Sequence, residues 1–249
     1  MLADLDSNAW PQKGRNKALV EIRRAWAPHL CGDQHLAVFL KHGIEEFGDG
    51  PFAFTSPAIV NTIYGRWWWP EEETAGPNPV ANSPLPWTGD YVDGLGNKIS
   101  MMAYANPPNR NDEKQRGDGF GVVRFNKATQ KITFECWPRF ADVKDGDKAQ
   151  YAGWPITIDY RSNDGRKPIG HLPELVVSGS DRPVIQVIHA QSNEILYTVR
   201  ATSNRFKPPV YKDGTYSVKI GRDKPNLKTL EGLKALAKGS NAELKINLQ

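Results

Sequence analysis

Asp33 and His35 are the residues of this chain whose types and spacing best suit metal chemistry. They belong to the motif Gly32-Asp33-Gln34-His35, which directly follows the short apolar segment His29-Leu30-Cys31. A carboxylate oxygen and an imidazole nitrogen two residues apart, at the end of a strand, can bind a divalent or trivalent metal ion. The same spacing also arises from a turn aspartate beside a structural histidine. Spacing alone therefore leaves both interpretations open.

Arg66 is the best candidate in the chain for binding a phosphate group. Its guanidinium offers a bidentate fork, and the neighbouring aromatic run, Trp67 to Trp69, could hold it in place. The alternative is that these tryptophans only fill the edge of a core. His42 would lie on the same helical face as His35, where it either supports the metal site or interacts with a helix end.

The composition is that of a globular, loop-rich protein, with 39% apolar residues, 24% charged residues, 22 Gly and 19 Pro. The net charge of +4 comes from residues spread along the chain, and no run of Lys or Arg is typical of a nucleic-acid-binding arm. No apolar stretch approaches the ~20 residues of a membrane span. Cys31 and Cys136 form no disulfide framework, and either a single bridge or two free thiols is possible.

The elements that must position the motif belong to a first unit, which we expect to cover residues 1 to about 158. The apolar periodicity of 16–27 predicts a helix that Pro28 ends. A short buried strand at 29–31 then leads into the motif. A second amphipathic helix is predicted over 36–47.

The rest of this unit contains one long loop and one hairpin. Residues 70–98 are rich in Pro, Gly, Asn and Asp, which predicts a long ordered loop, and such loops are often functional. Residues 119–137 alternate apolar and polar side chains on both sides of Asn126-Lys127-Ala128-Thr129. This alternation predicts an antiparallel hairpin.

After a polar linker at 155–168, a second unit is expected at 168–249. Alternating segments at 183–203 and 212–221, separated by turn residues, predict short antiparallel strands. Residues 227–238 favour a short helix, and a last strand follows it. We therefore predict a small all-β sandwich.

Around the motif, the chain carries a series of segments with a family resemblance. They are LDSNAWPQKGRNKALVEIRRAWAPHLCGDQHLAVFLKHGIEEFGDGPFAFTSPAIVN, RWWWPEEE, PWTGDYVDGLGNK and ECWPR. These segments resemble the C-terminal half of PhoD-like metallophosphatases, the alkaline phosphatase D group of the calcineurin-like metallophosphoesterase superfamily. The resemblance extends over residues 1 to about 157.

The resemblance implies both a fold and an activity. In the family, Gly-Asp-x-His follows a core strand of a two-sheet α/β/β/α fold and supplies ligands to a multinuclear metal centre. By resemblance, Asp33 and His35 are metal ligands, with iron and calcium as the implied metals and manganese or zinc as alternatives. The implied reaction is hydrolysis of phosphate monoesters or diesters. Family members are often exported, which implies a periplasmic or extracellular location for the full-length protein.

The family's earlier metal ligands have no counterpart before Gly32. We therefore expect an α/β fold that is a partial metallophosphoesterase domain, a fragment in which Asp33 and His35 are part of a larger ligand set. One functional hypothesis is a metal-dependent phosphoester hydrolase with an incomplete site. The other is a non-catalytic, β-rich binding or attachment module derived from such an enzyme. The oligomeric state stays open.

Overall fold

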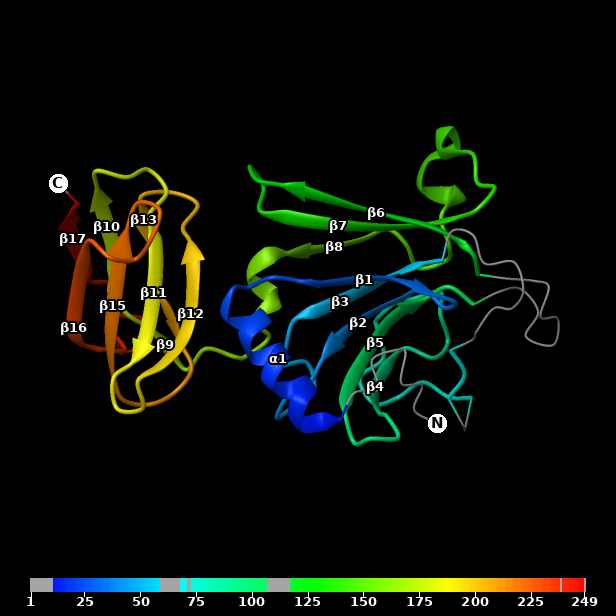
Figure 1. The fold of residues 1–249 in the computed structure, drawn as a ribbon, viewed down its shortest axis with the longest axis horizontal. Helices are drawn as coiled ribbons and strands as arrows, with labels where there is room; N and C mark the ends of the chain where they lie inside the picture. The colour runs from blue at the N-terminus through cyan, green and yellow to red at the C-terminus, as the bar shows by residue number, and fades with distance from the viewer. Residues whose placement is uncertain (1–10, 59–67, 71–72, 107–116, 238, 249) are drawn as a thin grey trace. The chain divides into compact units, whose positions relative to one another are not determined.

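The computed structural model describes residues 11–58, 68–70, 73–106, 117–237 and 239–248. The protein is mainly β, with 42% of its residues in strands and 11% in helices. It divides into two compact units, one of residues 1–23 and 27–165 and one of residues 24–26 and 166–249. The boundary after Gly165 falls between the ends predicted for the two units. Figure 1 shows both units along the chain.

The helix predicted at 16–27 is confirmed as α1, Gln12–Arg24. It buries the apolar side chain of Leu19 and the charged side chains of Arg15 and Arg23. Arg15 donates hydrogen bonds to the carbonyl oxygens of Gly43, at 2.8 Å, and Lys98, at 3.1 Å. Because these bonds run from the helix to two distant segments, they fix α1 to the first unit.

A five-stranded sheet forms the centre of the first unit. Its strands are β1 His29–Gln34, β2 Val38–His42, β3 Phe52–Pro57, β4 Gly89–Val92 and β5 Lys98–Tyr104. The spatial order is β1-β3-β2-β5-β4. β1 runs parallel to β3, and the other neighbours are antiparallel. β1 is therefore an edge strand with a parallel neighbour on one side.

The helix predicted over 36–47 is wrong, because this segment forms β2 and the turn after it. Phe39 is buried in the cluster on one face of the sheet, and Leu40 is buried in the cluster on the other face. A central strand that is covered on both faces has a continuous apolar run, which periodicity alone does not separate from a buried helix. Gly43 then makes a tight turn, since a Cβ there would lie 2.5 Å from the Glu46 carbonyl oxygen.

A three-stranded antiparallel sheet, β6-β7-β8, belongs to the same unit. Its strands are β6 Gly119–Asn126, β7 Lys131–Pro138 and β8 Ile156–Asp159. The predicted hairpin is confirmed as β6 and β7. The linker predicted at 155–168 is wrong in its first half, which forms β8 and a 3₁₀ helix, η2 Tyr160–Asn163. A second 3₁₀ segment, η1 Val143–Ala149, connects β7 to β8.

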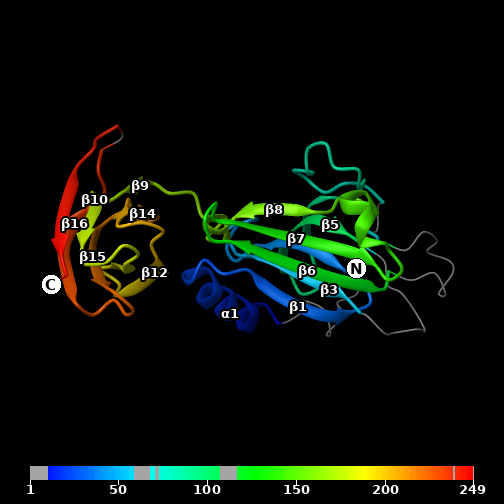
Figure 2. The same ribbon diagram turned by 90° about the horizontal axis from the view of Figure 1, so that it is seen from above.

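The core of this unit lies between the two sheets. Phe39 and Phe54 of the larger sheet contact Phe134 of β7, with ring centroids 4.7 and 5.7 Å apart. Trp154 lies against the same two rings of the larger sheet. Figure 2 shows β6, β7 and β8 layered over the larger sheet. The unit thus consists of two packed sheets, with α1 bonded to the larger one.

The second unit is built only of strands and loops in the part that the structure describes. One sheet has the order β12-β11-β15-β16, a second has the order β13-β10-β17, and β9 pairs with β14. The bounds are β9 Gly170–His171, β10 Glu174–Ser178, β11 Val184–His189, β12 Glu194–Arg200, β13 Arg205–Phe206, β14 Pro209–Val210, β15 Thr215–Gly221, β16 Lys228–Lys234 and β17 Glu243–Asn247. The predicted strands within 183–203, at 212–221 and at the C-terminus are confirmed.

The short helix predicted at 227–238 is wrong, because residues 228–234 form the edge strand β16. Leu230 pairs with Val218 and Leu233 with Tyr216, so the register shifts by one residue between them. Gly232, with φ of +70°, lies inside this irregularity. The shift gives the two leucines a helix-like spacing of three although both belong to a strand. Within the described residues, no helix has the length and apolar character required to cross a lipid bilayer.

Candidate metal site at the end of β1

The motif Gly32-Asp33-Gln34-His35 lies at the carboxyl end of the edge strand β1. Cys31 pairs with Thr55 and Gln34 with Pro57, so β1 has one residue more than β3 between these pairs. This irregularity interrupts the ladder at Gly32 and Asp33. Such bulges are over-represented at sheet edges and beside active sites.

The two predicted metal ligands lie on either side of the last residue of β1. The backbone of Asp33 belongs to β1, whereas its side chain lies outside the part that the structure describes. His35 follows in a bend before β2, and its side chain is partly buried. Because β1 and β3 are parallel, their carboxyl ends lie at the same end of this pair of strands.

Arg66, the predicted phosphate-binding residue, lies outside the described residues, as does Trp67. Trp68 is buried among Leu40, Ala53 and Met101, and its indole donates a hydrogen bond to the Trp87 carbonyl oxygen at 2.8 Å. The core-filling interpretation therefore holds for Trp68.

His42 lies in a different environment from the predicted one. It is the last residue of β2, not part of a helix shared with His35, and only 1% of its surface is exposed. Its Nδ1 accepts a hydrogen bond from Arg15 at 2.9 Å, and its Nε2 lies 3.5 Å from Nδ1 of His29. Burial, and then the charge of Arg15, lowers the pKa of His42 well below its usual value. His42 thus anchors α1 to the sheet.

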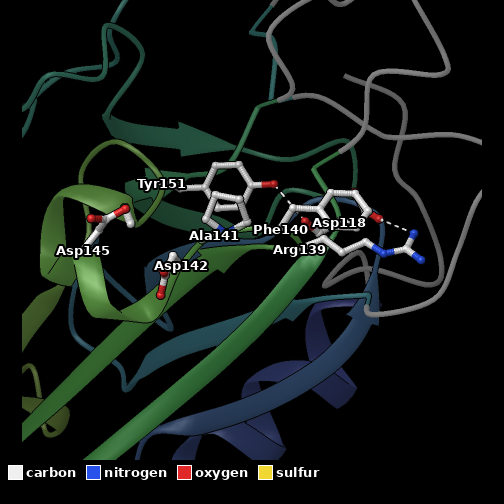
Figure 3. A pocket seen from close by; sticks show the side chains of 9 residues that line it. Asp118, Arg139, Phe140, Ala141, Asp142, Asp145 and Tyr151 are labelled. Carbon is white, nitrogen blue, oxygen red and sulfur yellow. Dashed lines mark hydrogen bonds and ion pairs between the residues drawn. The ribbon is translucent and has the colours of Figure 1, made fainter.

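A surface hollow of about 500 Å³, which was not predicted, lies at the carboxyl end of β3 (Figure 3). The amide of Gly119 donates to the carbonyl oxygen of Ala58, directly after β3, at 3.1 Å. Asp118, next to Gly119, lines the hollow together with Arg139 and Tyr151. Because Pro57 pairs with Gln34 of the motif, the hollow and the motif lie at the same end of the β1–β3 ladder.

The polar groups of the hollow are held in a fixed arrangement. Arg139 forms an ion pair with Asp118 at 3.2 Å, and the Tyr151 hydroxyl donates to the Asp118 carbonyl oxygen at 3.0 Å. Burial raises the pKa of Tyr151, so the phenol stays protonated. Asp142 and Asp145 also line the hollow. Asp145 forms an ion pair with Lys148 at 3.8 Å, so two of the three carboxylates of the hollow already face a cation.

The described residues contain no group of three or more His, Cys, Asp or Glu side chains placed to hold a metal ion. Asp33 and His35 supply donor atoms of the right kind, but catalytic zinc sites, for comparison, have three protein ligands. Of the two candidate ligands, only the side chain of His35 belongs to the part that the structure describes.

Comparison of the chain with protein-family models, with curated proteins and with solved structures finds no match.

Proposed function

We propose that this chain acts in metal-dependent phosphoester hydrolysis, with Asp33 and His35 as two of the metal ligands. The observation that carries the proposal is the position of Gly32-Asp33-Gln34-His35. The motif lies at the irregular carboxyl end of a strand that runs parallel to its only neighbour in the described residues. This position agrees with the one implied by the resemblance to PhoD-like metallophosphatases.

The architecture of the first unit also supports the proposal. The resemblance implies two packed sheets flanked by helices, and this unit has a five-stranded and a three-stranded sheet with α1 bonded to the larger one. The finer assignment, a partial α/β/β/α metallophosphoesterase domain, is part of the proposal.

The residues have separate roles in the proposed activity. Asp33 would provide a carboxylate oxygen and His35 an imidazole nitrogen, and metal ions bind both groups in their deprotonated forms. When bound, the metal ions of such a centre activate water and stabilise negative charge on the phosphoryl group. Because catalytic metal sites of this kind have at least three protein ligands, tight metal binding and turnover require further ligands in addition to Asp33 and His35.

Metal content by elemental analysis, after incubation with iron, calcium, manganese or zinc, tests this proposal. The test compares the native chain with the double variant Asp33→Asn/His35→Gln. Asp181→Asn/His171→Gln is the matched control, since it makes the same chemical changes at exposed positions of the second unit. We expect metal uptake that the site variant loses and the control keeps. Equal uptake by the native chain and the site variant, or no uptake by either, would refute the ligand assignment.

Hydrolysis of a chromogenic phosphate monoester and a diester by the same proteins separates binding from catalysis. Turnover that depends on Asp33 and His35 would show that residues outside the described part complete the centre. Metal uptake with background turnover is the expected result for two ligands. Turnover that is unchanged in the site variant would overturn the proposed function.

A further inference from the structure

Basic and acidic residues occur along the whole chain, but the excess of basic residues lies in the second unit. Residues 166–249 carry 14 Lys and Arg against 7 Asp and Glu, a net charge of +7. Residues 1–165 carry 18 Lys and Arg against 21 Asp and Glu. The net charge of +4 is therefore the sum of a negative net charge in residues 1–165 and a positive net charge in residues 166–249. Such an asymmetry suggests an anionic partner for the basic unit.

Part of this charge gathers at one end of the sheet β12-β11-β15-β16. Val184, the first residue of β11, pairs with Arg200, the last residue of β12, and with Gly221, the last residue of β15. We call this row of three paired residues the rung. Two loops adjoin the rung, at 179–183 and 222–227. The loops carry three exposed cations, and Arg200, the last residue of β12, is a fourth. We call this group the arginine corner: Arg182, Arg200, Arg222 and Lys224.

Backbone carbonyl groups hold the arginine corner together. Arg200 donates to the carbonyl oxygens of Arg182, at 3.0 Å, and Arg222, at 2.9 Å, and thereby joins the two loops. Arg222 donates to the carbonyl oxygens of Gly179, at 2.9 Å, and Leu248, at 3.3 Å. These bonds orient two guanidinium groups, and because the acceptors are neutral, the bonds leave their charge in place.

Carboxylates offset only part of this charge. Asp223 forms an ion pair with Arg200 at 3.3 Å, and its side chain is 92% exposed. Asp181 is the other acidic residue of the two loops. Glu174 and Glu243 are paired with Arg205, and Glu194 with Lys212, away from the corner. Four cations against two carboxylates leave the corner with an excess positive charge.

We propose that the arginine corner binds a linear polymer that carries repeating phosphate groups. Guanidinium groups match the geometry of phosphate oxygens, and those of Arg200 and Arg222 are already oriented. Each contact at an exposed cation is weak and screened by salt, so several contacts along one polymer must act together. The two loops contain no aromatic residue on which a base could stack, which favours a non-nucleotide polymer over a nucleic acid.

Binding of inorganic polyphosphate to the full-length chain, measured by fluorescence anisotropy of a labelled polymer, tests this proposal. The double variant Arg182→Gln/Lys224→Gln removes two charges whose side chains make no hydrogen bond or ion pair within the described residues. Lys234→Gln/Lys245→Gln is the matched control, since it removes two exposed charges elsewhere in the unit. We expect at least about tenfold weaker binding in the corner variant and a change within about twofold in the control.

Two further measurements define the ligand class. Affinity should fall steeply as salt rises from ~50 to ~200 mM, since several phosphate contacts release counterions. Orthophosphate should compete poorly. Equal affinity in the native chain and the corner variant, or equal loss in the control, would overturn the proposal. Tighter binding of a single-stranded oligonucleotide of matched charge would overturn the assignment to a non-nucleotide polymer.

Discussion

The guanidinium of Arg15, on α1, donates a hydrogen bond of 2.9 Å to Nδ1 of His42, at the end of β2. Because a guanidinium can only donate, His42 accepts through Nδ1 and carries its proton on Nε2. That nitrogen lies 3.5 Å from Nδ1 of His29. The buried imidazole is thus held neutral between a fixed cation and a second histidine, and a proton added to it would break the contact with α1.

The first prediction is that acid destabilises the first unit through His42. The pKa of His42 is lowered first by burial, then by Arg15 and then by His29. A histidine whose folded pKa lies below its unfolded value of about 6.5 gives its full stability above that pH. As the pH falls below ~6.5, unfolding should become easier by up to about 1.4 kcal/mol per pH unit, until the folded pKa is reached.

Urea unfolding curves at about pH 8 and about pH 5 measure this effect. The variant His42→Gln should be less stable near pH 8 but should lose most of the pH dependence, because it has no imidazole to protonate. An unchanged slope in the variant would assign the acid sensitivity to another group.

The second prediction concerns Arg15 itself. Arg15→Met keeps an unbranched apolar stem but removes the guanidinium, and so leaves the carbonyl groups of Gly43 and Lys98 and Nδ1 of His42 without their donor. We expect a loss of about 3 kcal/mol in the free energy of unfolding, because buried acceptors without donors are costly. Lys17→Met, at an exposed position of the same helix, is the control and should change stability by less than about 0.5 kcal/mol. Equal losses in both variants would show that the helix, not the Arg15 bonds, is sensitive to substitution.

Elements were predicted correctly where residues close together in the sequence determine the local structure, and were missed where distant contacts determine it. The hairpin of β6 and β7 was predictable because Asn126 marks its turn, where its side-chain oxygen accepts from the amides of Ala128 and Thr129. β2 was predicted as a helix, because Phe39 and Leu40 are buried on opposite faces of the sheet and the strand therefore lacks an alternating pattern. β16 was missed because a shift in register gives Leu230 and Leu233 a helical spacing.

In the candidate site, too, the local motif could be predicted from the sequence and the contacts between distant residues could not. The strand before Asp33 and His35 was predicted from the apolar segment 29–31 and is confirmed as β1. It is not buried as predicted, because Leu30 and Cys31 are exposed on this edge strand. The bond between Arg15 and His42 and the hollow lined by Asp118 and Tyr151 join residues 27 and 33 positions apart in the chain. Periodicity and motif spacing carry no information on such contacts, so they became visible only in the folded chain.

The third prediction tests the core between the two sheets of the first unit. Phe134 is fully buried and contacts Phe39 and Phe54. Phe134→Ala should lower the free energy of unfolding by about 3–5 kcal/mol, through lost burial and the cavity left behind. Phe140, which follows β7 and is 89% exposed, provides the control, and Phe140→Ala should stay within about 0.5 kcal/mol of the native chain. Comparable midpoints for both variants in urea would show that the two sheets do not depend on this contact.

The fourth prediction concerns the two cysteines, which are both free thiols. Cys31 is exposed on the edge strand β1, whereas Cys136 is buried in the core, where burial strongly raises its pKa. A thiol reagent should therefore modify one cysteine of the folded chain and both after unfolding in urea. Cys31→Ser should abolish modification of the folded protein, and Cys136→Ser should leave it unchanged.

The rate of this modification reports on the contact of Cys31 with Thr55. Although Cys31 is exposed as a residue, its thiol is partly buried at the contact with Thr55, which raises its pKa. The hydrogen bond with the Thr55 hydroxyl, at 3.0 Å, partly opposes this shift. Thr55→Val removes the hydroxyl, so the pKa should rise further and modification near neutral pH should slow, since the thiolate is the reactive form. The rate should recover as the pH is raised. Faster modification in Thr55→Val at every pH would instead show that access to the edge strand, and not the thiolate fraction, limits the reaction.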